Sequence, residues 1–384
     1  MKIVHFALSC FYIEGYKYQE NILPTIHAQS GHEVLVVASC VSFDEKGNNS
    51  LIKPTKYVSK DGFNVIRVPY RPPFNKGALC RVRSYVGVYD ILDSFAPDII
   101  YFHGCSAWEL NTVVRYIKRH REVVLFLDNH GDKYNSATTW FSRVIQHKMF
   151  YRPVLRRALP YTEKVLCPSI ECMDFCREIY GVPEDKLEFY PLGGMVIDQE
   201  ERDAIGGKLR EEEKIDSDTV IFTHTGRMCS EKRTLEIIDA FSATTDPRFH
   251  LWIIGVLMDD LKEAALEKIK KDERITYLGW KKGEELYKYL CATDCYVQPG
   301  GQSATMQNAI CCGCAVMLFP FKSHQPFLKG NGYFVSTEQD MVNAFEDISA
   351  HPEKIAEMRK KSYVVAHELL DYKKLAARVC ITRK

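Results

Sequence analysis

Short apolar runs that alternate with helix-like stretches, in two separate series, constrain the fold of this 384-residue chain more than any other feature. Runs that are apolar on both faces and follow one another through helices are typical of parallel sheets covered on both sides. The first series predicts strands at Lys2–Leu8, Glu33–Ala38, Ile99–Phe102, Val123–Leu127 and Lys164–Cys167, and helices at Gln19–Ser30 and Thr112–Arg119. We expect Lys164–Cys167 to be the last strand of this sheet.

The second series starts after a glycine-containing loop and a charged stretch over 190–214. It predicts strands at Val220–Thr225, His250–Gly255, Ile275–Leu278, Cys295–Gln298 and Ala315–Leu318, and helices at Glu231–Ala243, Leu261–Lys270, Glu284–Cys291 and Thr305–Cys312. We therefore predict an α/β protein with two Rossmann-like, doubly wound domains facing across a cleft. The expected domains are 1–190 and 191–365, with a C-terminal helix in 366–384 that packs back toward the N-terminal domain. Ligands of such sheets bind at the carboxyl ends of the strands.

The charge balance and the cysteines exclude two classes of protein. Lysine and arginine number 51 and aspartate and glutamate 50, so the net charge is +1. A main partner of nucleic acid calls for a basic excess, so we expect no nucleic acid partner. The 14 cysteines lack the density of a disulfide framework, which indicates a reducing compartment. Cys311 and Cys314 stand in an apolar run and read as buried core rather than as a zinc or redox site.

Membrane contact, if the chain makes any, is expected to be peripheral. No apolar stretch reaches the roughly 20 residues that span a bilayer. The apolar start reads as a first buried strand rather than a signal peptide, because His5 interrupts it. From Arg143 to Arg157, basic and aromatic residues mix in a helical region that would suit an anionic membrane or a lipid-diphosphate acceptor. A solvated basic helix face explains that region equally well. We expect a cytoplasmic protein, with any membrane contact at the inner face.

The most informative segment is a strand that runs into Gly226 and Arg227 and is followed by a helix. Lys232 and Arg233 fall in the expected first turn of that helix, where the helix dipole disfavours cations unless an anion lies nearby. Solvated surface charges are the alternative. Because Arg227 lies at the carboxyl end of a strand beside a glycine turn, we predict a phosphate site there.

Further strand ends carry residues suited to ligand binding. The turn at Gly300 and Gly301 precedes a helix whose cap is Ser303 or Thr305. Free N–H groups at such a helix start can hold a diphosphate or sugar hydroxyls. In the N-terminal half, His130 and the turn around Gly15 also follow strands, so we predict that they face the cleft. A structural role is the alternative for a lone histidine.

Several motifs are absent from the sequence. It has no G-x-G-x-x-G fingerprint, no G-x-x-x-x-G-K-[ST] loop and no G-x-S-x-G elbow. The only D-x-D, at Asp216 and Asp218, precedes a strand and reads as a solvated turn. We therefore expect neither a metal site nor a cofactor.

These segments together resemble the family-4 glycosyltransferases, retaining enzymes of GT-B architecture, over most of the chain. The resemblance is carried by Gly31-His32-Glu33-Val34, His130, Gly226-Arg227 with Lys232, Tyr277-Leu-Gly-Trp280 and Asn308 to Gly313. It implies that Arg227 and Lys232 hold the donor diphosphate and that His130 contacts the transferred sugar, these three being the catalytic set. It assigns donor contacts to Gly15, Gly226, Trp280, Gly301, Gln302, Ser303 and Asn308.

One departure concerns the family's two glutamates, which are separated by seven residues. Asn308 stands at the second position, and Gln302 and Ser303 lie where the first would be. In the front-face mechanism that the resemblance implies, the leaving phosphate deprotonates the acceptor, and amide and hydroxyl groups can still position the sugar.

The expected function is metal-independent, retaining hexosyl transfer from a nucleotide-diphosphate sugar to a glycan or lipid-linked acceptor. Its usual setting is bacterial surface-polysaccharide assembly, including that of lipopolysaccharide. Two alternatives remain: a nucleotide-sugar epimerase of the same architecture, and a non-catalytic module that binds a nucleotide sugar or a partner subunit.

Overall fold

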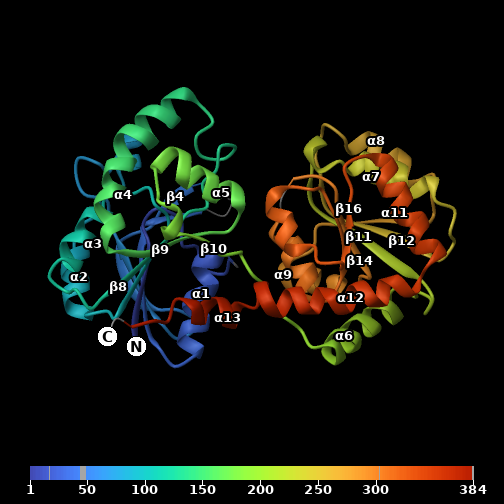
Figure 1. Ribbon diagram of the computed structural model, residues 1–384, viewed down its shortest axis with the longest axis horizontal. Helices are drawn as coiled ribbons and strands as arrows, with labels where there is room; N and C mark the ends of the chain where they lie inside the picture. The colour runs from blue at the N-terminus through green and yellow to red at the C-terminus, as the bar shows by residue number, and fades with distance from the viewer. Residues whose placement is uncertain (17, 44–48, 302, 383–384) are drawn as a thin grey trace. The chain divides into compact units, whose positions relative to one another are not determined.

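The computed structural model describes residues 1–16, 18–43, 49–301 and 303–382. The chain folds into two compact units: Met1–Pro191 together with the C-terminal segment that begins at Lys373, and Leu192–Tyr372. Each unit contains one large sheet with helices packed against it (Figure 1). The predicted fold class, two doubly wound α/β domains, is confirmed.

The sheet of the first unit has the strand order β10-β9-β8-β7-β1-β2-β6-β5. Its strands are β1 (Lys2–Ala7), β2 (Glu33–Ser39), β5 (Thr55–Val58), β6 (Asn64–Val68), β7 (Ile99–Phe102), β8 (Val124–Asp128), β9 (Thr162–Cys167) and β10 (Leu187–Phe189). A separate hairpin pairs β3 (Val41–Phe43) with β4 (Asn49–Leu51). The expectation that Lys164–Cys167 ends the sheet was wrong, because β10 pairs with β9. β10 has only three residues, one of them charged, so its apolar pattern is too short to read.

Helices connect these strands, and the last helix returns to the first unit. They are α1 (Gln19–Gln29), α2 (Val88–Phe95), α3 (Leu110–Ile117), the π-helix Ser142–Tyr151, α4 (Arg152–Ala158), α5 (Ile170–Phe175) and α13 (Tyr372–Arg378). α13 lies beside α1 (Figure 1), where the Ala376 carbonyl oxygen is 3.0 Å from Nε2 of His27. The Tyr190 hydroxyl also donates to the Leu375 carbonyl oxygen at 2.6 Å. α13 is thus anchored by hydrogen bonds to buried side chains.

The sheet of the second unit has the order β13-β12-β11-β14-β15-β16 and is parallel throughout. Its strands are β11 (Val220–Met228), β12 (Phe249–Leu257), β13 (Ile275–Gly279), β14 (Cys295–Gln298), β15 (Ala315–Leu318) and β16 (Gly332–Phe334). Its helices are α6 (Gln199–Glu212), α7 (Thr234–Ala243), α8 (Lys262–Ile269), α9 (Gly283–Ala292), α10 (Ala304–Cys311), α11 (Glu338–Ala350) and α12 (Glu353–Val365). On one face, Phe222 packs edge-to-face against Phe241, Phe249 and Phe345 at ring distances of 4.9–6.0 Å. Such aromatic pairs stabilise a core beyond the apolar area they bury.

Both sheets change winding direction at one internal position. In the first unit, β2 and β6 extend the sheet from one side of β1, and β7 to β10 extend it from the other. In the second unit the change falls between β11 and β14. In open α/β sheets, ligands bind outside the carboxyl ends of the strands at such a switch point. The topology therefore marks one candidate site in each unit.

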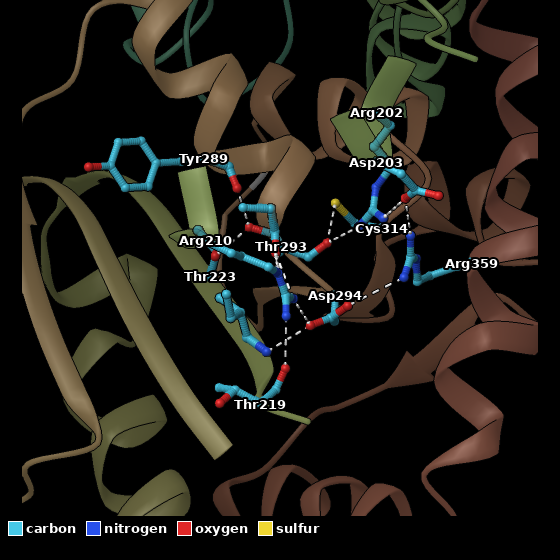
Figure 2. Close-up of polar contacts among 12 residues, drawn as sticks. Arg202, Asp203, Arg210, Thr219, Thr223, Tyr289, Thr293, Asp294, Cys314 and Arg359 are labelled. Atoms are coloured by element: carbon cyan, nitrogen blue, oxygen red, sulfur yellow. Dashed lines mark hydrogen bonds and ion pairs between the residues drawn. The ribbon is translucent and has the colours of Figure 1, made fainter. Parts of the chain in front are cut away.

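A polar network, shown in Figure 2, lies at the amino ends of the strands in the second sheet, at the opposite edge from the switch-point site. The Asp294 carboxylate, just before β14, accepts hydrogen bonds from the Arg210 guanidinium and from the Ile221 N–H at 2.9 Å. Arg359 on α12 lies 3.5 Å from the other carboxylate oxygen. Arg210 also donates to the carbonyl oxygens of Thr219 and Ala292. One carboxylate thus ties α6 and α12 to the amino ends of β11 and β14.

Candidate functional site

A cavity of about 330 Å³ lies in the first unit at the predicted end of its sheet. Its lining includes residues that follow three adjacent strands: Ser9 and Cys10 after β1, His103 to Ser106 after β7, and Asp128 to Gly131 at the end of β8. Strands β1 and β7 are the pair at which the winding changes direction. The cavity therefore occupies the switch point of the first sheet.

His130 lines this cavity and is partly open to solvent, with 39% of its side chain exposed. Its Nε2 is 3.8 Å from Oδ2 of Asp128. Burial disfavours the charged ring, but the charge of the Asp128 carboxylate outweighs this and raises the pKa of His130. His130 is therefore a side chain that can carry a proton and donate it to a bound oxygen.

Asp128 is the buried centre of the polar groups in the cavity. Its Oδ1 accepts the Gly104 N–H at 2.6 Å, and its Oδ2 lies 2.7 Å from Nδ1 of His103. Burial alone would raise the pKa of the carboxyl, but the charges of His103 and His130 hold it well below its usual range. Asp128 therefore stays ionised behind His130. In the sequence, Asp128 directly follows the apolar run Val123–Leu127. The sequence does not reveal that two imidazoles, those of His103 and His130, lie next to its carboxylate.

Sequence reasoning also missed Glu20 and Arg83, which line the same cavity. Burial raises the pKa of Glu20 on α1, and the charges of His103 and His130 oppose that rise. Arg83 donates from Nη1 to Ser9 Oγ at 3.0 Å and to the Ser106 carbonyl oxygen at 2.8 Å. Glu20 lies at the start of the helix that follows the turn after β1, and this position near a strand end could have marked it as a candidate. Arg83 reaches the cavity from a loop remote in sequence, so no local pattern could place it there.

In the second unit, the turns after β11 and β14 meet at the switch point. A Cβ on Gly300 would lie 2.3 Å from the Glu231 carbonyl oxygen and 2.8 Å from Cα of Lys232, so only glycine fits there. The Lys232 ammonium donates to the Gly301 carbonyl oxygen at 3.1 Å. Burial lowers the pKa of Lys232, partly offset by nearby Cys229 and Glu231. The structure thus brings together Lys232 and Gly301, which were predicted from separate segments.

The expected helix geometry at Arg233 was wrong. Lys232 ends a 3₁₀ turn over Ser230–Lys232, and α7 begins only at Thr234. Arg233 adopts the left-handed backbone conformation with φ of +57° and pairs with Glu236. It also donates to the carbonyl oxygens of Pro299 and Ser336. Arg233 therefore links neighbouring turns by hydrogen bonds. It lies outside α7, so the helix dipole gives no reason to expect an anion beside it.

Arg227 and Gly226 lie on β11 itself, near its carboxyl end. Arg227 is exposed, and the contact found for its guanidinium is with the sulfur of Met258, 4.0 Å from Nη2. Gly226 has a φ of +130°, and its carbonyl oxygen would be 1.8 Å from a Cβ on Gly255. Gly226 and Gly255 therefore allow the backbones of β11 and β12 to approach closely next to the exposed Arg227.

The remaining residues predicted to contact the donor lie in several different parts of the structure. Ser303 caps α10 by accepting the Thr305 N–H at 3.1 Å, as predicted. The Asn308 side chain lies near Gly194, where a Cβ would be 3.0 Å from its Oδ1. Trp280 follows β13 and is 65% exposed. Gly15 is exposed with a φ of +82° and is not among the residues that line the cavity around His130. Gln302 lies outside the described residues.

Two further predictions concern cysteines and membranes. Cys311 and Cys314 are free and fully buried, as expected for core residues. Within the described ranges, no group of three or more His, Cys, Asp or Glu side chains is arranged to hold a metal ion. In the same part of the chain, no helix is both long and apolar enough to cross a bilayer.

Solved structures share this fold at low sequence identity. HepE from Anabaena in complex with UDP is 15% identical, with a TM-score of 0.67, and the match covers 99% of this chain and 98% of that one. WaaG, a glycosyltransferase involved in lipopolysaccharide biosynthesis, is 13% identical with a TM-score of 0.63, covering 98% and 99%. UDP-GlcNAc 2-epimerase from Neisseria meningitidis, bound to UDP-GlcNAc, is 12% identical with a TM-score of 0.58, covering 99% of both chains.

Sequence comparison with protein families gives a match in each unit. Residues 27–193 match the family described as Glycosyltransferase Family 4, and residues 219–351 match glycosyl transferases group 1. None of the curated proteins compared with the chain matches it in sequence. The two family matches and the shared GT-B fold agree with each other, and the chain is a glycosyltransferase of the family-4 and group 1 type.

Proposed function

We propose that the protein transfers a hexose, with retention of the anomeric configuration and without a metal, from a nucleotide-diphosphate sugar to a glycan or lipid-linked acceptor. The observation that carries this proposal is the contact at the switch point between β11 and β14, where the turn after β11, which carries Lys232, meets the glycine turn at Gly300 and Gly301. A partly buried ammonium at a site of this kind suits a diphosphate, because a charge acts more strongly where water is excluded.

In this proposal each residue has one task. Lys232 and Arg227 neutralise the charge that grows on the leaving diphosphate, and the exposed face of Trp280 receives the base. His130 contacts the transferred sugar. The diphosphate takes the proton of the acceptor hydroxyl, so the protein supplies position and charge rather than a catalytic base. Ser303, Asn308 and Gln302 take over hydrogen bonds to the donor that glutamates make elsewhere in the family.

Two structures of the same fold suggest which donor and which biological setting to test first. HepE binds UDP, and WaaG is involved in lipopolysaccharide biosynthesis. We therefore propose a UDP-sugar as the first donor to test and surface-polysaccharide assembly as the setting, with the protein in the cytoplasm.

We also propose a peripheral membrane contact through the Arg143–Arg157 region. Arg143, Lys148 and Met149 in this helical region are exposed, and Trp140 and Phe141 before it are 69% and 58% exposed. Basic and aromatic side chains together bind anionic membrane surfaces. Sedimentation with phosphatidylglycerol vesicles tests this contact. Binding that is lost in Trp140→Ala/Lys148→Ala supports it, and equal sedimentation of both proteins contradicts it.

The transfer itself is tested by incubating the protein with UDP-, GDP-, ADP- and TDP-hexoses in EDTA, with and without glycan acceptors. We expect release of one nucleoside diphosphate that depends on the acceptor, and a product whose anomeric proton shows the donor's configuration. An inverted anomer contradicts retention. Binding of a nucleotide sugar without turnover for any acceptor would favour the non-catalytic module.

An epimerase is the second candidate, because the cavity in the first unit holds more titratable groups than the sequence indicated. Glu20, Asp128 and His130 all line it, and epimerisation needs groups that remove and return a proton. The same assay separates the two functions. A sugar whose ring configuration changes in the absence of an acceptor identifies an epimerase.

A further inference from the structure

Three buried imidazoles form a hydrogen-bonded row that leads from the C-terminal helix to the cavity. Nε2 of His27 is 3.0 Å from the Ala376 carbonyl oxygen, and its Nδ1 is 3.0 Å from Nε2 of His5. Nδ1 of His5 is 3.1 Å from Nε2 of His103, whose Nδ1 is 2.7 Å from Asp128 Oδ2. All four side chains are at most 2% exposed. The row is therefore shielded from bulk water along its whole length.

The two ends of the row fix how many protons it must hold. A carbonyl oxygen and a carboxylate oxygen can only accept, so both ends require a hydrogen from an imidazole. Four contacts join Ala376, His27, His5, His103 and Asp128, and each contact needs one hydrogen. Three neutral imidazoles carry only three. The row therefore requires one additional proton. Without it, one of the four buried contacts would bring two lone pairs together.

The surroundings decide where that proton resides. Asp128 accepts the Gly104 N–H at 2.6 Å and lies 3.8 Å from His130, and both neighbours favour the carboxylate over the neutral acid. Burial and the neighbouring rings lower the pKa of His5, and burial lowers that of His27 to about 4. These two rings therefore resist the charge, whereas Nδ1 of His103 lies 2.7 Å from the carboxylate oxygen that would offset it.

We propose that His103 is a histidinium that keeps Asp128 ionised and oriented behind His130, so that His5, His27 and His103 act as positioning residues for His130. The role given to His130 rests on the proposed function, whereas the proton count does not. In every arrangement each contact holds one hydrogen, so the charge can also move to His5 or His27 by shifts within the contacts, without a ring turning. The other titratable groups that face the row are Cys10, Glu20, His32, Tyr101, His130 and Tyr190.

The substitution Asp128→Asn separates the charge from the contacts. Its amide nitrogen can donate to Nδ1 of a neutral His103, and its oxygen can still accept the Gly104 N–H. Three neutral imidazoles, each protonated at Nε2, then satisfy the whole row. The variant therefore removes the additional proton while it keeps the shape, the hydrogen bonds of the row and the bond to the Gly104 N–H.

Nitrogen NMR of the full-length protein labelled with ¹⁵N-histidine tests the proposal at pH 8.5, where an unperturbed histidine is neutral. We expect one imidazole with both nitrogens protonated in the wild type and in His130→Gln, and none in Asp128→Asn. A wild-type spectrum without a histidinium overturns the proposal whether or not a variant folds. A histidinium that persists in Asp128→Asn, or disappears in His130→Gln, also overturns it.

Turnover supplies a readout that a purely structural role would not move. If Asp128 positions His130, Asp128→Asn lowers kcat for the sugar transfer roughly 10- to 100-fold, as loss of a carboxylate behind a functional histidine does at metal sites, with KM for the donor and the melting temperature unchanged. An unchanged kcat overturns the positioning role. Absence of transfer by the wild type, with the histidinium present, refutes the proposed function and leaves the proton count standing.

Discussion

Replacing Lys232 by alanine is expected to lower kcat/KM for the nucleotide sugar by roughly 10²- to 10³-fold, the cost of removing one preorganised group that stabilises transition-state charge. Lys232 lies in the turn after β11 of the second unit, and its ammonium donates to the carbonyl oxygen of Gly301, in the glycine turn after β14, at 3.1 Å. Because it is partly buried, its charge is screened less than that of a surface lysine. The measurement is initial-rate kinetics with the donor identified in the transfer assay.

The matched control for this variant is Lys271→Ala. Lys271 follows α8, is 69% exposed and pairs with Glu267 on the surface. Such pairs contribute little, so we expect unchanged kinetics. Equal kcat/KM for the two variants would show that Lys232 has no part in the reaction, and the donor site would then have to be placed elsewhere.

Replacing Asp294 by alanine is expected to lower the free energy of unfolding of the second unit by about 3–5 kcal/mol, the usual cost of removing one partner of a buried charge pair. The carboxylate is 10% exposed, and its loss leaves Arg359 without this partner and Arg210 without its ion pair. The Ile221 N–H also loses its acceptor. Urea titration measures the loss, and hydrogen exchange of β11 assigns it to the second unit.

Asp216→Ala is the matched control for that variant, because Asp216 is exposed on the turn before β11. A surface substitution of this kind changes stability by no more than about 0.5 kcal/mol. If Asp294→Ala costs less than about 1 kcal/mol, or if amides of the first unit exchange faster instead, the network does not hold the second unit together.

The longer buried parallel strands were predictable because burial on both faces leaves a continuous apolar run. β14 and β15 have the predicted bounds, and β1 and β11 begin where expected. The strands β3, β4, β5, β6, β10 and β16 were not foreseen. β5 and β10 lie at the edges of the sheet, where partly exposed residues break the apolar pattern.

The candidate sites were predictable only where a residue follows a strand directly. His130 and Gly301 were proposed in this way, because parallel strands bring their carboxyl ends to one edge. Arg233 was misassigned because the sequence gives no sign that a left-handed residue separates a 3₁₀ turn from α7. The imidazole row was missed because His5, His27 and His103 come from three segments that only the tertiary structure joins.

Thermal unfolding in the presence of UDP, GDP, ADP, TDP and CMP, each at millimolar concentration with and without EDTA, tests the central claim most directly. A nucleotide present at about 100 times its dissociation constant stabilises the folded protein by roughly 2.7 kcal/mol. We predict a rise in melting temperature with one nucleoside diphosphate, unaffected by EDTA and absent in Arg227→Ala/Lys232→Ala. If no nucleotide raises the melting temperature, or if the double variant responds like the wild type, the turns after β11 and β14 are not the donor site.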